Sequence, residues 1–212
     1  MPTSRISAIE RLRELPEVFT LDAAAAGLGC GPRMALSHVE QWRNRGLVAS
    51  PGPRVGIHFN LLRNPRAIEE RRMEMLALLL PGAVVGGPSA VHGAGWTTQI
   101  PNGIDIMVLS RPSFPALDGI DIHGRPQSWV ESAKNWIALP GPVPWLDPAY
   151  ALADCVDQRI WTPDPDDIEW DEVDPATIRR AFDHFGLDIP EKWKADLERI
   201  AGNPTPPDAG EP

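Results

Sequence analysis

Residues 21–45 read LDAAAAGLGCGPRMALSHVEQWRNR and contain two helical patterns separated by glycines. Thr20 precedes the first pattern, where its hydroxyl can accept a hydrogen bond from a free N–H of the first helical turn. The glycines of Gly29-Cys-Gly31 end that helix in a tight turn. Pro32 then begins a second helix, because proline has no N–H and the first turn of a helix needs none. Gly46 ends this helix, so the stretch predicts two helices joined by a sharp turn.

The segments on both sides of this stretch complete a larger motif. Residues 4–15 predict an earlier helix, because isoleucine and leucine recur every third residue along one stripe. Two short apolar runs, residues 47–49 and 55–59, flank Pro51-Gly-Pro-Arg54, a pattern typical of a β-hairpin. Three helices followed by a hairpin is the layout of a winged helix-turn-helix domain. In that domain the third helix enters the major groove of DNA and the hairpin forms the wing.

The helix that begins at Pro32 has an apolar and a polar side when it is projected at 100° per residue. We expect the residues of the apolar side to pack against the two earlier helices: Ala35, Leu36, Val39 and Trp42. The candidate DNA contacts are the polar residues of the other side and one arginine of the hairpin: Arg33, Ser37, Gln41, Asn44, Arg45 and Arg54. Such side chains can pair with guanine or adenine or hold phosphates. The alternative is a solvated polar face on an ordinary small helical domain.

The charge of the chain is divided between its two parts. Residues 1–66 carry nine basic and five acidic residues, whereas residues 67–212 carry eleven basic and 24 acidic residues, and the whole chain has a net charge of −9. The basic part fits double-stranded DNA as its partner. The acidic part fits a protein partner better than a second nucleic acid, because its charge would repel phosphate.

The second part of the chain predicts short strands and helices. A helix is expected over residues 66–80, and strands are expected over residues 83–86, 104–109 and 120–124. Further helices begin at Asp147-Pro148, Asp174-Pro175 and Pro190. The predicted fold class is α+β, with a winged helix-turn-helix domain at residues 1–66 and a mixed α/β domain with C-terminal helices at residues 67–201. The proline-rich residues 202–212 are expected to form a disordered tail.

Two stretches of the second part resemble the AbiEi family, whose members are antitoxins of type IV toxin–antitoxin systems. The first stretch runs from Val85-Gly-Gly-Pro-Ser89 to Gln99-Ile-Pro101 and Asp105, and the second is Asp147-Pro-Ala-Tyr-Ala-Leu-Ala-Asp154. The resemblance implies a winged helix that binds operator DNA and represses its own operon. It also implies that the rest of the chain neutralises a nucleotidyltransferase-like toxin. The alternative is a winged-helix regulator whose second domain senses a small molecule.

The sequence offers no motif for catalysis, a metal or a cofactor. A nucleotidyltransferase needs a pair of aspartates on one strand, but Asp105 stands alone. Ser89 and His92 predict a helix start better than a catalytic pair. The acidic run of residues 164–174 lacks the central glycine of a calcium-binding loop, which favours a solvated loop. The five histidines and two cysteines have no ligand spacing. We therefore expect a protein that is not an enzyme.

The chain has no membrane signature. No window approaches the roughly 18 apolar residues of a transmembrane helix, and residues 1–7 have no apolar signal region. We expect a cytoplasmic protein with no membrane partner.

Overall fold

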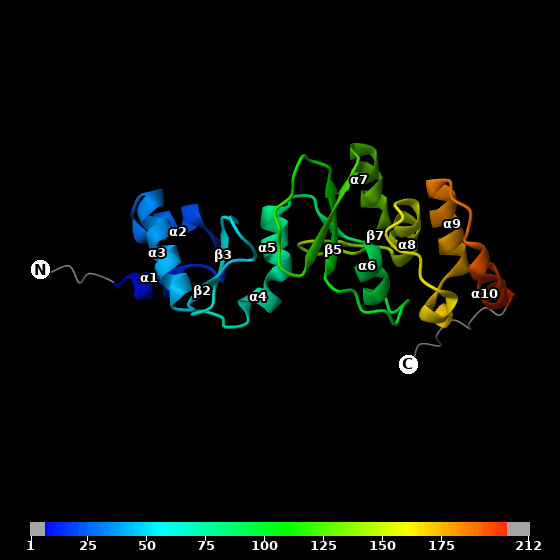
Figure 1. Ribbon diagram of the computed structural model, residues 1–212, viewed down its shortest axis with the longest axis horizontal. Helices are drawn as coiled ribbons and strands as arrows, with labels where there is room; N and C mark the ends of the chain where they lie inside the picture. The colour runs from blue at the N-terminus through cyan, green and yellow to red at the C-terminus, as the bar shows by residue number, and fades with distance from the viewer. Residues whose placement is uncertain (1–6, 203–212) are drawn as a thin grey trace, which may run out of the picture. The chain divides into compact units, whose positions relative to one another are not determined.

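The computed structural model describes residues 7–202 and has an α+β fold (Figure 1). The α+β class expected from the sequence is therefore confirmed. The chain divides into two compact units, each described by itself below. The first unit comprises the chain up to Gly82 together with Pro112–Asp118, and the second comprises Ala83–Arg111 and the chain from Gly119 onward. The predicted tail lies almost wholly outside the described residues.

The first unit contains five helices and a small antiparallel sheet within its described residues. Its elements are α1 (Ala8–Glu14), β1 (Val18–Thr20), α2 (Leu21–Leu28), α3 (Pro32–Asn44), β2 (Val48–Ala49), β3 (Ile57–Asn60), α4 (Ala67–Glu70) and α5 (Arg72–Leu79). The strands lie in the order β1-β3-β2. Strands β2 and β3 form the expected hairpin, with Ala49 opposite Phe59. Strand β1, which was not predicted from the sequence, pairs with the other edge of β3.

The turn between α2 and α3 forms as its sequence predicts. The hydroxyl of Thr20 accepts a hydrogen bond from the Ala23 N–H at 3.2 Å and caps α2. Gly29 ends α2 with a left-handed backbone, φ 62°, which glycine adopts without strain. Pro32 is the first residue of α3. The described part of the earliest helix begins later than predicted, with Ser7 as the cap of α1, and residues 4–6 lie outside the described residues.

The core of the first unit joins α1, α2 and α3. Its fully buried side chains include Leu12, Phe19, Ala24, Val39 and Trp42. The amide of Asn60, itself buried on β3, donates hydrogen bonds to the carbonyl oxygens of Leu12 and Leu15 at 2.7 and 3.1 Å. The end of α1 is therefore held to the sheet.

One residue of the expected core is exposed. Leu36 is 44% accessible, whereas Ala35, Val39 and Trp42 are buried as predicted. Leu36 lies 100° around the helix axis from Ala35. That rotation places it outside the arc that the packed side of α3 covers, so the assignment of Leu36 to the core was wrong.

The helix expected over residues 66–80 is broken in two. Arg71 separates α4 from α5 with a φ of −112°, and its side chain pairs with Glu17 at 2.7 Å and Glu74 at 2.8 Å. Both helices belong to the first unit, because they make more contacts within it than with the second unit, and the main segment of the first unit ends at Gly82. The boundary in the structure thus falls later than the residue 66 expected for the end of the DNA-binding module.

The second unit contains a five-stranded mixed sheet with helices packed against it. Its elements are β4 (Val84–Val85), α6 (Gly87–Gly93), β5 (Ile104–Leu109), β6 (Ile120–Arg125), α7 (Gln127–Ala133), the 3-10 helix η1 (Lys134–Trp136), β7 (Ile137–Leu139), β8 (Trp145–Leu146), α8 (Pro148–Asp157), the 3-10 helices η2 (Pro165–Asp167) and η3 (Trp170–Glu172), α9 (Pro175–Phe185) and α10 (Glu191–Gly202). The strand order is β6-β5-β4-β8-β7. Helix α6 packs on α8, which packs on α9 (Figure 1).

A buried ion pair joins the sheet of the second unit to α8. Arg125 on β6 donates to the carboxylate of Asp154 on α8, with Nε–Oδ1 at 3.0 Å and Nη2–Oδ2 at 2.6 Å. Both side chains are almost completely buried. The guanidinium also lies over the Trp129 ring, 5.7 Å from its centroid. The pair therefore links residues 29 positions apart in a region that water does not reach.

Replacement of Asp154 tests how far the second unit depends on this pair. We expect Asp154→Ala to lower the free energy of unfolding by about 3–5 kcal/mol, because the Arg125 charge would remain buried without a partner. Urea denaturation of the full chain, followed by tryptophan fluorescence, measures the loss. The control is Glu70→Ala, which breaks the exposed Arg66–Glu70 pair and should cost less than about 1 kcal/mol. Equal effects of the two variants would contradict the assigned role of the buried pair.

Candidate nucleic-acid interface

The outward side of α3 brings together five of the six residues predicted to contact DNA. Arg33, Ser37, Gln41 and Asn44 lie on α3 at intervals of three or four residues, and Arg45 is its C-cap. All five are exposed. Since residues three and four apart share a face of a helix, these side chains form one polar surface. We call Arg33, Ser37, Gln41, Asn44 and Arg45 the α3 surface.

The opposite side of α3 fixes the direction of this surface. Ala35, Val39 and Trp42 are buried in the core with residues of α1 and α2. Trp42 also stacks on the His38 ring, with centroids 5.9 Å apart. Because three residues along α3 are packed, the helix has little freedom to rotate about its axis.

The sixth predicted residue, Arg54, lies in the turn between β2 and β3. Arg54 and Pro53 are exposed, whereas Pro51 and Val55 beside them are buried. The N–H of Asp118 donates to the carbonyl oxygen of Pro51 at 3.0 Å. The segment Pro112–Asp118 therefore packs against the base of the turn and leaves its tip exposed.

Close packing under the turn also explains Gly52. A Cβ atom at this position would collide with the backbone carbonyl of Ala116. Arg54 adopts a left-handed backbone, φ 59°, which is uncommon for a residue with a side chain. The turn thus has a defined shape that presents Pro53 and Arg54.

His58 forms the buried base of the hairpin. Its Nδ1 lies 2.9 Å from the Ser50 hydroxyl, and its ring lies 5.5 Å from the Phe19 ring. Burial, together with the smaller effect of the positive charge of Arg43, lowers the pKa of His58 from 6.5 to about 4. The ring is therefore neutral at pH 7, and no role for it was predicted from the sequence.

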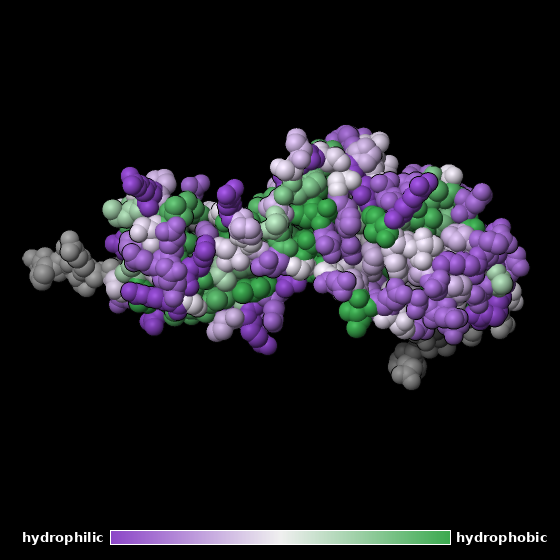
Figure 2. Space-filling view, in the orientation of Figure 1, coloured by the Kyte–Doolittle hydropathy of each residue, from purple (hydrophilic) through white to green (hydrophobic). Residues whose placement is uncertain are grey.

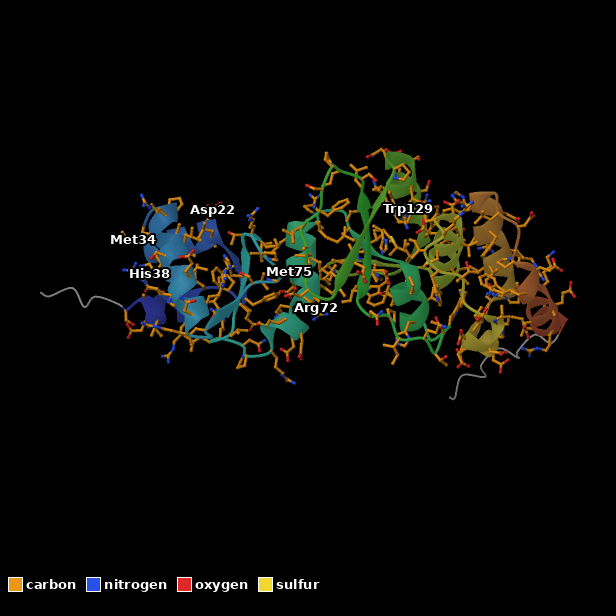
Figure 3. All side chains as sticks on the ribbon, viewed as in Figure 1. Asp22, Met34, His38, Arg72, Met75 and Trp129 are labelled. Carbon is orange, nitrogen blue, oxygen red and sulfur yellow. The ribbon has the colours of Figure 1, made fainter. Side chains whose placement is uncertain are left out.

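The charges around the α3 surface suit an anionic partner. Arg33, Arg43 and Arg45 are exposed on α3 or at its end, and Glu40 is the acidic residue of the helix. Two exposed apolar residues, Met34 and Leu36, flank the polar side chains. Figure 3 shows Met34 with His38 along α3. No role for Met34 was predicted from the sequence.

The second unit exposes an isoleucine on a well-held loop. Ile100 is 80% accessible and lies between α6 and β5. Its neighbour Gln99 donates to Asp167 at 2.6 Å and accepts from the indole N–H of Trp161 at 2.9 Å. The Thr97 hydroxyl donates to the Asp167 carbonyl oxygen at 2.8 Å. The loop therefore presents Ile100 beside the acidic run of residues 164–174.

The acidic run is largely exposed to solvent, as expected from its sequence, but parts of it fold into the short 3-10 helices η2 and η3. Its exposed carboxylates are Asp164, Asp166, Glu169, Asp171, Glu172 and Asp174. Hydrophilic side chains cover much of this end of the chain in Figure 2. Asp164 pairs with Lys192 at 2.7 Å, and Asp174 caps α9. Within residues 7–202, no group of three or more histidine, cysteine or acidic residues is arranged to hold a metal ion.

A buried polar cluster lies where β5 meets α6. The Ser89 hydroxyl donates to Asp105 Oδ2 at 2.7 Å, and His123 Nε2 lies 3.0 Å from Asp105 Oδ1. His92 instead faces the Thr97 carbonyl oxygen at 3.2 Å, so Ser89 and His92 do not form a pair. Ser89 lies inside α6, and Gly86 is the N-cap, which corrects the role expected for Ser89. Asp105 is the residue that accepts the Ser89 N–H.

The two cysteines are free thiols with different surroundings. Cys155 is buried, and burial with the nearby charge of Asp154 raises the pKa of its thiol far above the ordinary value. Such a thiol has little thiolate character and is a poor nucleophile. Cys30 is partly exposed in the turn before α3.

The fold and the surfaces define a class: an α+β protein whose first unit presents a basic helix face and whose second unit presents an acidic face. Its fold is similar to that of the RV2827C protein from Mycobacterium tuberculosis, with a TM-score of 0.52. That similarity covers 91% of this chain and 79% of the other at 17% sequence identity, which shows a shared fold alone. No family model and no curated protein matches the sequence. Among the described residues, no helix is long and apolar enough to cross a membrane.

The buried histidine predicts a pH dependence of the first unit. The folded pKa of His58 lies below its unfolded value, so its contribution to stability is full above pH 6.5 and is lost as the pH falls toward 4. The total loss is about 3 kcal/mol, because one pKa unit corresponds to about 1.4 kcal/mol. NMR titration of the His58 ring in the full chain should give a pKa of about 4. A pKa near 6.5 would contradict the tight packing of the hairpin base.

Proposed function

We propose that this protein is an antitoxin that binds the operator DNA of its own operon and represses it. In this proposal the first unit is a winged helix-turn-helix domain, and the second unit neutralises a nucleotidyltransferase-like toxin. The observation that carries the proposal is the α3 surface, where five polar or basic side chains share the exposed side of one well-packed helix.

The order of elements supports the winged-helix interpretation. Helices α2 and α3 are joined by the short turn at residues 29–31, and the β2–β3 hairpin follows α3. Strand β1 pairs with the hairpin at its open edge. In this motif the helix after the turn is the recognition helix, and the hairpin turn contacts the DNA backbone. Here these elements are α3 and the turn that carries Arg54.

The chemistry of the side chains fits these two roles. Arg33 can donate two hydrogen bonds to guanine, and Gln41 or Asn44 can pair with adenine. Arg54 is exposed at the tip of the hairpin, where contact with a phosphate gives affinity but no sequence preference. The positive net charge of residues 1–66 favours the approach of DNA.

The second unit supports the antitoxin role through charge and shape. The segments that resemble the AbiEi family fall on β4, α6, β5 and α8, which include the packed helix pair α6 and α8. Ile100 projects from a held loop beside exposed carboxylates. An exposed apolar side chain beside charged residues is typical of an interface anchor. A basic surface on a toxin that acts on nucleotides or nucleic acid would be complementary to these carboxylates.

DNA binding by the full chain tests the first half of the proposal. Fluorescence anisotropy with the duplex upstream of its own reading frame should show affinity that falls steeply as salt rises. Gln41→Ala and Ser37→Ala should lose about 1–3 kcal/mol of preference over random DNA. Arg54→Ala should weaken binding to both duplexes alike. Arg66→Ala is the control, because Arg66 is an exposed arginine outside the α3 surface and pairs with Glu70.

Two results would count against this half. Binding that does not depend on salt would exclude a contact with the phosphate backbone. Equal losses on both duplexes for Gln41→Ala, Ser37→Ala and Arg54→Ala would mean that α3 does not read bases.

Co-expression with the downstream gene tests the second half. If that gene product arrests growth, the full chain should restore growth and Ile100→Arg should fail to do so, because a cation would meet a basic partner at the anchor. Leu139→Arg is the matched control, since Leu139 is an exposed apolar residue on β7. Full rescue by Ile100→Arg would place the interface elsewhere. A harmless downstream product would remove the antitoxin role and favour a regulator that senses a small molecule.

A further inference from the structure

Two apolar side chains stand exposed on the helix that the proposed function places in the major groove. Met34 is 59% accessible and Leu36 is 44% accessible, both in the first half of α3. Burial of such side chains is favourable, and neither belongs to the core of the first unit. The fold therefore leaves apolar surface at the end of α3 where a recognition helix contacts base edges.

The two residues lie on opposite flanks of the α3 surface. At 100° per residue, Met34 and Leu36 are about 160° apart across the outward side of α3, and the arc between them contains Arg33 and Ser37. Figure 3 shows Met34 on the flank that also carries His38. The polar side chains thus have an apolar neighbour on each side.

The arginines near Met34 and Leu36 indicate what kind of partner could cover these two side chains. A symmetric pairing of two copies through α3 would bring Arg33, Arg43 and Arg45 of each copy against the same arginines of the other. DNA instead supplies phosphates for the arginines. The major groove also offers one apolar group to a side chain, the C5 methyl of thymine. DNA therefore matches both the arginines of the helix, through its phosphates, and the exposed Met34 and Leu36, through its thymine methyl groups.

We propose that Met34 and Leu36 read thymine methyl groups in the operator. This inference rests on the proposed DNA binding and adds a specificity that the polar residues alone do not provide. Met34 is flexible and can follow a methyl group at more than one position. Leu36 is shorter and branched, so it can contact a methyl group over a smaller range of positions on the other flank.

Replacement of thymine by deoxyuridine provides the test, because it removes only the methyl group. The full chain is titrated by fluorescence anisotropy with its upstream duplex and with duplexes in which single thymines are replaced. We expect about fourfold weaker binding for each contacted methyl, as expected for the loss of one buried methyl-sized group. Met34→Ala or Leu36→Ala should bind the matching thymine and deoxyuridine duplexes equally.

A matched variant separates this effect from a general loss of binding. Leu78→Ala should bind the operator normally and keep the sensitivity to deoxyuridine, since Leu78 is an exposed leucine on α5 outside the α3 surface. Both apolar residues are exposed, so their alanine variants should fold like the wild type by circular dichroism.

The outcomes distinguish this inference from the proposed function. Binding that is salt-dependent but indifferent to deoxyuridine at every position would overturn the methyl readout and leave DNA binding intact. Sensitivity that persists in both Met34→Ala and Leu36→Ala would also overturn it. A chain that binds no DNA would remove the proposed function together with the inference. A chain that self-associates through Met34 in sedimentation, without methyl sensitivity, would assign the flanks to an interface between copies.

Discussion

The packing of Ala35, Val39 and Trp42 beneath α1 and α2 determines which side chains of α3 reach solvent. Thr20, Gly29 and Pro32 set where α2 ends and α3 begins, so the packed side of α3 meets the core in one register. The polar and basic residues are exposed as a consequence of that register. The proposed DNA contact of the first unit depends on this orientation of a single helix.

Buried polar groups hold distant segments together in both units. Asn60 ties the end of α1 to β3, and the Arg125–Asp154 pair ties β6 to α8. Asp105 satisfies both the hydroxyl and the N–H of Ser89 at the start of α6. Because an unpaired polar group is costly to bury, each of these links favours one arrangement of the chain. The exposed surfaces are therefore carried on well-defined supports.

The sequence was most informative where the structural signal is local. Caps and breakers such as Thr20, Gly29 and Pro32 act within one helical turn, and the helices beside them could be predicted. Strands β1 and β8, which were not predicted, contain only two or three residues each, and they exist because of pairing with distant strands. The exposure of Leu36 and Ile100 depends on where neighbouring elements end. The spacing of residues in the sequence does not indicate where a neighbouring helix or strand stops covering a side chain.

The proposed entry of α3 into the major groove of DNA can be tested residue by residue in solution. The experiment is an NMR titration of the isotope-labelled full chain with the duplex upstream of its own reading frame. We expect the largest shifts in backbone amides along α3 and at Arg54 in the hairpin turn, with those of α9 and α10 unchanged. Shifts confined to the second unit, or none along α3, would mean that α3 does not enter the groove.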